Sequence, residues 1–508
     1  MKRTLEKIAL LCAAGIVTIG ISGCSDVVDL DKVYFTKNMQ LTSQFGGLGV
    51  EWGAYEDTNK ITSEAWQRVL NHVDRLKPAK VRLMINYDWF CQNFDDKGNE
   101  DRSDDTWTYN FSNKWMENTI EILTYCQENN IQVAFGSWNV IGSMSDDVWG
   151  MMEDVSSDLR WAKISGDVLD FLVNKKGFTC IRYFVNTNEP NYRGIQGSSK
   201  NYNNTYEKWE QGVRNVRQKF DELGLDNIGI VGGDTTGLAG SIEYLSGISK
   251  NIPTLVGDYG VHMYVSNYYI DTGLLEGQIR DIYQMVKDND KRLGDSIQAN
   301  IWEAGLVDGK NVATDSNTLI ATYNYGLRMA DYTIQCVLAG INSVVYWNLD
   351  DAMHFMYRAD GSSNPKEWGM FSSLTAAPAN KHELRPWYHS SVLMTNLFRP
   401  DDHLFSSQTN NVELDDTFRA IASVSHNQKR GGIAAVNRGI QTVTKTFAIE
   451  EEISDADEIY VYTYNERSMR LGSDGYIIPN QIITGSLNKR ITVDIPANTL
   501  LVLSTTRL

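Results

Sequence analysis

The sequence predicts a (β/α)8 TIM barrel followed by a C-terminal antiparallel β-sandwich domain. Two patterns along the chain carry this prediction. From residue 45 to about residue 400, eight short apolar runs alternate with longer amphipathic stretches. From residue 401 to residue 508, short alternating runs follow one another, separated by Asn, Gly and Asp turns. The first pattern is typical of parallel βα units, and the second is typical of packed antiparallel sheets.

Length and charge limit the possible functions. The chain has 508 residues, of which 42% are hydrophobic, so it can form a large barrel with a second domain. Its formal charge is −17, and no basic stripe interrupts the acidic surface. A protein that binds nucleic acid needs such a stripe to neutralise phosphates, so we expect no nucleic-acid partner.

Residues 1–23 have the pattern of a secretion signal. A charged start precedes an apolar run, Ile8 to Ile21, that is too short for a stable membrane span. The run ends in "ISGC", which resembles a bacterial lipobox. The resemblance implies cleavage before Cys24, lipidation of its thiol and a membrane anchor in the cell envelope. An ordinary signal peptide with a chance cysteine is the alternative.

Residues 24–44 are expected to form an acidic tether. Acidic residues directly after the cysteine resemble the export signals of Bacteroidetes lipoproteins, which implies an outer-membrane location with a possible external face. The run "VYFTKNMQLT" in this segment is a possible additional strand of the sandwich.

The barrel is expected over residues 45–400. Its apolar runs are rich in Val and Ile, and the stretches between them, such as "SEAWQRVLNHVDRL", repeat apolar residues at spacings of three and four. Eight βα units fit a closed barrel. A doubly wound open sheet is the alternative, but "FGGLG" lacks the spacing of a phosphate-binding turn. The eight runs are residues 45–52, 79–86, 131–138, 179–186, 227–234, 258–265, 296–303 and 341–348.

Residues 401–508 are expected to form the sandwich, in which runs such as "RAIASVSH" and "EIYVYTYN" alternate with turns. This domain either binds sugar or braces the barrel, and bracing is the favoured interpretation.

Two glutamates stand where barrel strands are expected to end. Glu189, in "TNEP", follows the fourth run, and Glu303, in "IWEAG", ends the seventh. The carboxyl ends of the strands meet at one face of a parallel barrel, so both side chains can reach the same mouth. Two carboxyl groups about 5 Å apart are what retaining glycoside hydrolysis requires, because one attacks the anomeric carbon while the other protonates the leaving oxygen.

These motifs resemble glycoside hydrolase clan A, the retaining (β/α)8 glycosidases. "WEAG" resembles family 5, "NEPN" also occurs in family 39, and the layout of barrel plus sandwich resembles families 30 and 39. The resemblance implies that Glu303 is the nucleophile and Glu189 the acid and base. It also implies substrate-site roles for Arg82 beside the nucleophile, Asn188 at the sugar 2-hydroxyl, His262 and Tyr264 on the sixth strand, and Trp347 as the floor of the −1 subsite.

The chain departs from family 5 after the third strand. Family 5 carries a histidine there, whereas this sequence reads "GSWN", with Trp138 and Asn139. We expect these two residues to contact substrate instead. Glu51 and Asp234 also end strands and are candidate contacts to sugar hydroxyls. Singly, each of these residues also fits a packing or salt-bridge role in the barrel interior.

The roles proposed for Glu303 and Glu189 require different protonation states of the two carboxyl groups. Glu303 must be ionised in order to attack, and a neighbouring arginine and tyrosine favour that state. Glu189 must hold a proton, so burial and the charge of Glu303 are expected to raise its pKa.

The sequence therefore predicts a retaining β-glycoside hydrolase that acts on a β-linked polysaccharide or oligosaccharide by double displacement. It has a carbohydrate as its partner and needs no cofactor. A non-catalytic surface glycan-binding lipoprotein and a transglycosylase are the alternatives. No metal site is expected, because the loop "NFDDKGNEDRSD" has Lys97 where a calcium ligand belongs. The sugar, the linkage and the oligomeric state stay open.

Overall fold

The computed structural model describes residues 29–58, 62–95, 97–99, 101, 104–138, 157–191, 205–357, 361–373, 384–453 and 457–508. The proposed signal segment, Cys24 and Asn139 lie outside these residues.

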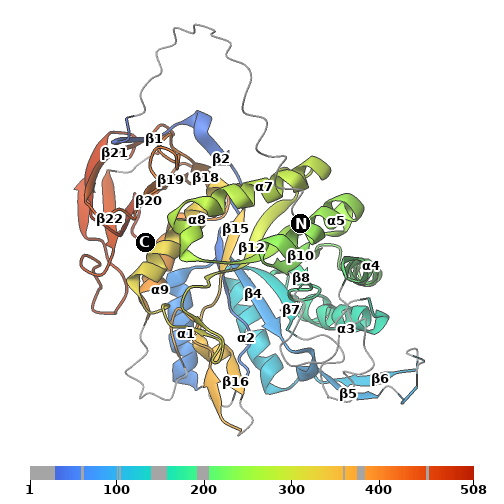
Figure 1. Ribbon diagram of the computed structural model, residues 1–508. Helices are drawn as coiled ribbons and strands as arrows, with labels where there is room; N and C mark the ends of the chain where they lie inside the picture. Colours follow the sequence, from blue (N-terminus) through green and yellow to red (C-terminus); the bar gives the residue numbers. More distant parts are fainter. Residues whose placement is uncertain are drawn as a thin grey trace, which may run out of the picture.

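A sheet in which every neighbouring pair of strands is parallel forms the centre of the molecule (Figure 1). The fifth predicted strand is divided into β9 and β10, and a parallel bridge between Ile230 and Val256 closes the ring. The predicted (β/α)8 barrel is therefore confirmed. Its strands are β3 (Leu48–Glu51), β4 (Lys80–Ile85), β7 (Gln132–Ser137), β8 (Ile181–Val185), β9 (Gly229–Ile230), β10 (Gly233–Thr236), β11 (Asp258–Val265), β12 (Gln298–Leu306) and β15 (Ser343–Tyr346).

Helices follow the strands and pack on the outside of the sheet (Figure 1). Local signals fix where they begin: Thr62, Asn113 and Thr205 each accept a hydrogen bond from a backbone N–H of the first turn. The barrel helices are α1 (Ser63–Leu76), α2 (Lys114–Glu128), α3 (Leu159–Leu169), α4 (Tyr206–Glu222), α5 (Leu238–Asn251), α7 (Leu274–Asn289) and α8 (Tyr323–Leu338).

The second domain consists of two sheets that enclose their own apolar core. One sheet has the order β2-β18-β19-β20-β25-β22-β23 and the other the order β1-β21-β24. Their strands are β1 (Lys32–Phe35), β2 (Gln40–Thr42), β18 (His403–Phe405), β19 (Phe418–Val424), β20 (Gly431–Asn437), β21 (Val443–Ile449), β22 (Glu458–Tyr464), β23 (Gln481–Thr484), β24 (Ile491–Ile495) and β25 (Thr499–Ser504).

The segment before the barrel contributes one strand to each of these sheets. β2 pairs antiparallel with β18, whereas β1 pairs parallel with β21. The predicted antiparallel sandwich is confirmed for residues 401–508, and the added strand β1 forms one parallel pair with it. A parallel partner can come from any distance along the chain, and β1 and β21 are separated by the whole barrel.

Helices α8 and α9 (Pro386–Leu397) lie between the barrel and the sandwich. Every residue of α9 after Pro386 is buried, because the helix contacts α8 and α1 as well as β20 and β25. A buried ion pair also crosses this boundary, with Arg419 of β19 bonded to Asp331 of α8 at 3.0 Å. The two domains therefore share a continuous packed interface. No described helix is long and apolar enough to cross a membrane.

Candidate active site

The two glutamates face one another at the carboxyl ends of β8 and β12. An oxygen of Glu189, an oxygen of Glu303 and a ring nitrogen of His262 all lie within 4.8 Å of one another. Glu189 is the more accessible carboxyl group, with 23% of its side chain exposed against 5% for Glu303. This short separation is characteristic of retaining glycosidases and leaves no room for a water molecule between the nucleophile and the sugar.

Irregular backbone geometry orients the side chains of Glu189 and Glu303. Glu189 has φ of 45°, which is rare for a residue other than glycine, and its N–H donates to the carbonyl of Asp234 at 3.0 Å. On β12, Trp302 is an extra residue in the pairing with β11, so that Glu303 lies beside His262. A bulge of this kind redirects the side chain that follows it. β12 then continues to Leu306, beyond the predicted end of the strand.

Arg82 of β4 lies at the centre of the site and is completely buried. Its Nη1 donates to Glu303 at 2.7 Å and to Glu51 at 3.2 Å. Its Nη2 donates to Asn188 Oδ1 at 2.7 Å and to Asp234 at 2.9 Å. Because the oxygen of Asn188 is occupied in this way, its amide nitrogen is left as a donor for a ligand hydroxyl.

His262 and Tyr264 of β11 hold the two carboxylates from the other side. The Tyr264 hydroxyl donates to Glu303 at 2.6 Å. The ring nitrogens of His262 lie 3.0 Å from Glu189 and 2.9 Å from Asp234. Together with the Arg82 bond, these contacts fix the orientation of the Glu303 carboxylate.

The pKa directions of the two glutamates are the reverse of those expected. Burial raises the pKa of Glu189, but the hydrogen bond and positive charge of His262 outweigh burial and lower it overall. Burial raises the pKa of Glu303, against the opposing charges of His262 and Arg82. The sequence reasoning assigned His262 to the site but left its charge out of the argument. The pKa of His262 rises to about 10 because the attraction of Asp234 and Glu303 exceeds the cost of burial.

His262 and Glu189 are close enough to share a proton. One proton lies between the two groups at neutral pH, held mainly on His262 in the absence of substrate. Moving it across 3.0 Å produces a protonated Glu189 and a neutral His262 without changing the charge of the pair.

The two remaining carboxyl groups differ in charge. Burial alone would raise the pKa of Asp234, yet Arg82 and His262 keep it below its usual value. Burial raises the pKa of Glu51 to about 8, so this side chain is mostly protonated at neutral pH.

Two tryptophans and an unpredicted histidine form an aromatic cluster beside Arg82. The ring centroids of Trp138 and Trp347 lie 5.6 Å apart at right angles, and the guanidinium of Arg82 lies 5.2 Å from the centre of the Trp138 ring. His354, from the segment after β15, contacts both tryptophans. The sequence feature that could have identified His354 as a site residue is its position in "DDAMHF", in a long loop after the eighth strand.

Glu189, His262 and Glu303 are close enough to hold a metal ion. All three groups already have partners within the described part of the chain, since His262 contacts Glu189 and Asp234, and Glu303 accepts from Arg82 and Tyr264.

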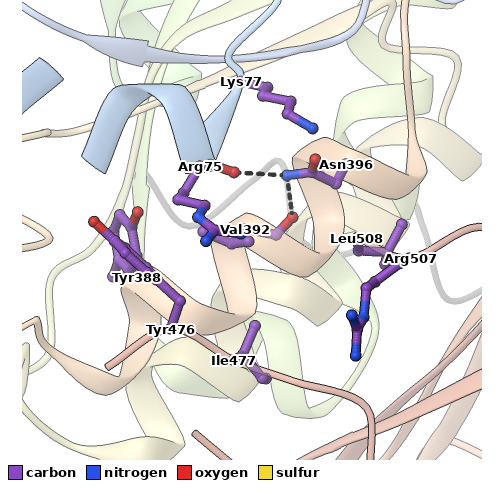
Figure 2. Close-up of a pocket in the computed structure, with 9 residues that line it drawn as sticks. All are labelled: Arg75, Lys77, Tyr388, Val392, Asn396, Tyr476, Ile477, Arg507 and Leu508. Carbon is purple, nitrogen blue, oxygen red and sulfur yellow. Dashed lines mark hydrogen bonds between the residues drawn. The ribbon is translucent and has the colours of Figure 1, made fainter. Parts of the chain in front are cut away.

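A separate cavity of about 170 Å³ lies where α1 and α9 meet the sandwich (Figure 2). None of the nine described residues that line it is acidic, and three are basic. Arg75 and Lys77 stand at the end of α1, where cations favourably oppose the helix dipole. This cavity lacks the paired carboxyl groups of the barrel mouth.

No protein-family model matches the chain, and no curated protein matches it. Solved structures match its fold over 93% of its length. A glycoside hydrolase family 30 subfamily 8 xylanase from Clostridium acetobutylicum matches with a TM-score of 0.60 and 13% identity, over 99% of that protein. A family 39 β-xylosidase from Caulobacter crescentus matches with a TM-score of 0.59 and 12% identity, over 99% of that protein. A conserved exported protein from Bacteroides fragilis matches with a TM-score of 0.62 and 10% identity, over its full length. The expected likeness to clan A is therefore confirmed for the fold.

Proposed function

We propose that the protein is a retaining β-glycoside hydrolase. The observation that carries the proposal is the short distance between Glu189 and Glu303, since one oxygen of each lies within 4.8 Å of the other. Arg82 and Tyr264 hold Glu303 with hydrogen bonds of 2.7 and 2.6 Å, as a fixed nucleophile requires.

In the first step, an oxygen of Glu303 attacks the anomeric carbon while the bond to the leaving oxygen breaks. Glu189 protonates that oxygen with the proton it shares with His262. In the second step, Glu189 removes a proton from water, which attacks the glycosyl ester and releases the sugar with its original configuration. Asn188 is placed to hold the 2-hydroxyl, and Trp347 and Trp138 border the sugar.

The substrate we propose is a β-linked oligosaccharide or polysaccharide. Two of the proteins that share the fold are described as a xylanase and a β-xylosidase, so β-xylosides are the first substrates to examine. A transglycosylase would use the same residues and would differ only in preferring a sugar to water as the acceptor. A non-catalytic glycan-binding lipoprotein is the other alternative, and it predicts binding without turnover.

The test is proton NMR of the first anomer released from an aryl β-glycoside by the purified protein. Retained configuration supports the proposal, and inverted configuration contradicts it. Glu189→Ala should slow substrates with poor leaving groups far more than activated aryl glycosides, because only the former need the proton. Azide should partly restore this variant by attacking the ester in place of activated water. An equal loss of activity on both kinds of substrate would contradict the role of Glu189 as the general acid.

We also propose that the mature protein begins at Cys24, is lipidated there and is anchored in the outer membrane of the cell envelope. The support is the motif "ISGC" and the acidic segment after it.

A further inference from the structure

His354 forms part of the aromatic cluster in the barrel mouth. Its ring is parallel to that of Trp347, with the centroids 5.4 Å apart and 6° between the planes. It meets Trp138 edge-on at 5.2 Å. Only 4% of the residue is exposed. His354 therefore packs against Trp347, the residue proposed as the floor of the −1 subsite.

The two nitrogens of the His354 ring have different surroundings. Nδ1 faces Oε1 of Glu56 at 3.4 Å, and the other oxygen of Glu56 accepts the N–H of Phe355 at 3.1 Å. Nε2 has no hydrogen-bond partner within the described part of the chain. A buried polar atom without a partner is unfavourable unless a ligand or an ordered water satisfies it.

The ring also lies near the Arg82 cluster. A Cβ placed on Gly53 would lie 3.4 Å from Oε1 of Glu51 and 3.8 Å from Cε1 of His354, the ring atom next to Nε2. That oxygen of Glu51 likewise has no described partner. The His354 ring and Glu51 thus both lie within 4 Å of the same point beside Gly53, and Arg82 bonds to Glu51 as well as to the proposed nucleophile.

We propose that His354 binds a hydroxyl group of the sugar that occupies the subsite at Trp347. This inference rests on the proposed function and adds a residue that determines specificity within the same site. With Nδ1–H directed at the Glu56 carboxylate, Nε2 is the acceptor and receives the hydrogen bond of the sugar hydroxyl. Glu56 fixes the tautomer, and the stacking on Trp347 fixes the plane of the ring.

The test compares two substitutions. His354→Phe keeps a flat ring against Trp347 and removes both nitrogens, whereas His354→Gln places an amide near the position of Nε2. We expect His354→Phe to lower kcat/KM for an aryl β-glycoside by roughly 10- to 100-fold, and His354→Gln to recover part of this loss. His426→Phe, on an exposed histidine of the sandwich, is the matched control and should leave kcat/KM unchanged.

Deoxy substrates distinguish hydrogen bonding from packing. The loss in His354→Phe should disappear for the one monodeoxy glycoside that lacks the bound hydroxyl, and should persist for the others. An equal loss for every deoxy substrate, or no loss for the parent glycoside, would overturn the inference even if the wild-type protein is an active hydrolase.

A binding measurement separates this inference from the proposed function. Calorimetric titration with methyl β-xyloside and methyl β-glucoside measures the affinity of wild type and of His354→Phe for these sugars, whether or not turnover occurs. Weaker binding to the variant alone supports the role of His354, and equal binding contradicts it. If the wild-type protein neither binds nor hydrolyses any β-glycoside, the proposed function fails and this inference fails with it.

Discussion

Replacing Glu51 with glutamine should stabilise the protein, and the gain should increase with pH. Glu51 is fully buried beside Arg82, whose Nη1 donates to its Oε2 at 3.2 Å. A glutamine carbonyl can accept the same hydrogen bond. The substitution therefore fixes the neutral state that burial already favours at neutral pH.

The magnitude follows from the pKa of Glu51, which is about 8 in the folded protein and 4.5 for an ordinary glutamate. Because the folded state holds this proton more tightly, its contribution to stability is complete below pH 4.5 and is lost as the pH rises through 8. At pH 7 the loss is about 3 kcal/mol, and above pH 8 it approaches about 5 kcal/mol. Glutamine has no proton to lose and avoids this cost.

The assay is thermal unfolding of both proteins at several pH values. The entropy of unfolding of a chain of this length is roughly 1 kcal/mol per degree, so the variant should unfold about 3 °C higher at pH 7 and about 5 °C higher at pH 9. At pH 5 the difference should shrink to about 1 °C. Glu121→Gln, the same change on the exposed face of α2, is the control and should give a small difference that does not vary with pH.

The result that refutes this reasoning is a difference between Glu51→Gln and wild type that stays constant from pH 5 to pH 9. A destabilised variant at pH 9 would mean that Glu51 is needed as an anion beside Arg82. The raised pKa of His262 also makes stability decline toward pH 10, but it does so in both proteins and cancels in the comparison.

Further predictions concern the reacting groups, the pH profile and the anchor. Glu303→Gln should abolish turnover while the unfolding temperature falls by no more than a few degrees, and near-normal turnover in the folded variant would contradict the mechanism. Tyr264→Phe should lower kcat/KM by roughly 10- to 100-fold, because it removes a hydrogen bond to a charged group; an unchanged kcat/KM would show that the 2.6 Å contact does not act in the transition state. In the pH profile of kcat/KM, the acidic loss of activity should be centred above pH 4.5, because the raised pKa of Glu303 lets it gain a proton there. The alkaline loss should begin only as the pH approaches 10, where His262 loses its proton. An alkaline loss centred below pH 7 would contradict the shared proton. Mass spectrometry of the mature protein from its native host should show residues 1–23 missing and acyl chains on Cys24, whereas an unmodified Cys24 would rule out the anchor.

The barrel could be predicted from the sequence because its signals are local. Each strand is a short apolar run, and each helix repeats its apolar residues every three to four positions. The positions of Glu189 and Glu303 followed from the same reasoning, since strand ends meet at one face. The division of the fifth strand into β9 and β10 was not predicted, because the run "NIGIVGGD" is continuous in its apolar pattern.

The parts that could not be predicted depend on contacts between distant segments. β1 finds its parallel partner β21 across more than 400 residues. His354 reaches the two tryptophans only because the segment after β15 folds back over the barrel mouth. The pKa of Glu189 depends on the positive charge of His262, and the pKa of His262 depends on Asp234 from another strand. None of these arrangements leaves a periodic signal in the sequence.

The proposed mechanism keeps the charge of the buried cluster constant. Before reaction, Glu303 is an anion, and the pair formed by His262 and Glu189 is neutral because it holds one proton. In the first step the proton leaves that pair for the leaving group, while the charge on Glu303 disappears into the glycosyl ester. The pair becomes negative as Glu303 becomes neutral, so Arg82 and Asp234 experience no change in total charge. In a site as buried as this one, an uncompensated charge would be costly. The contacts of His262 with both Glu189 and Asp234 therefore provide what the double displacement needs, namely a proton that can move as the nucleophile gains and loses its charge.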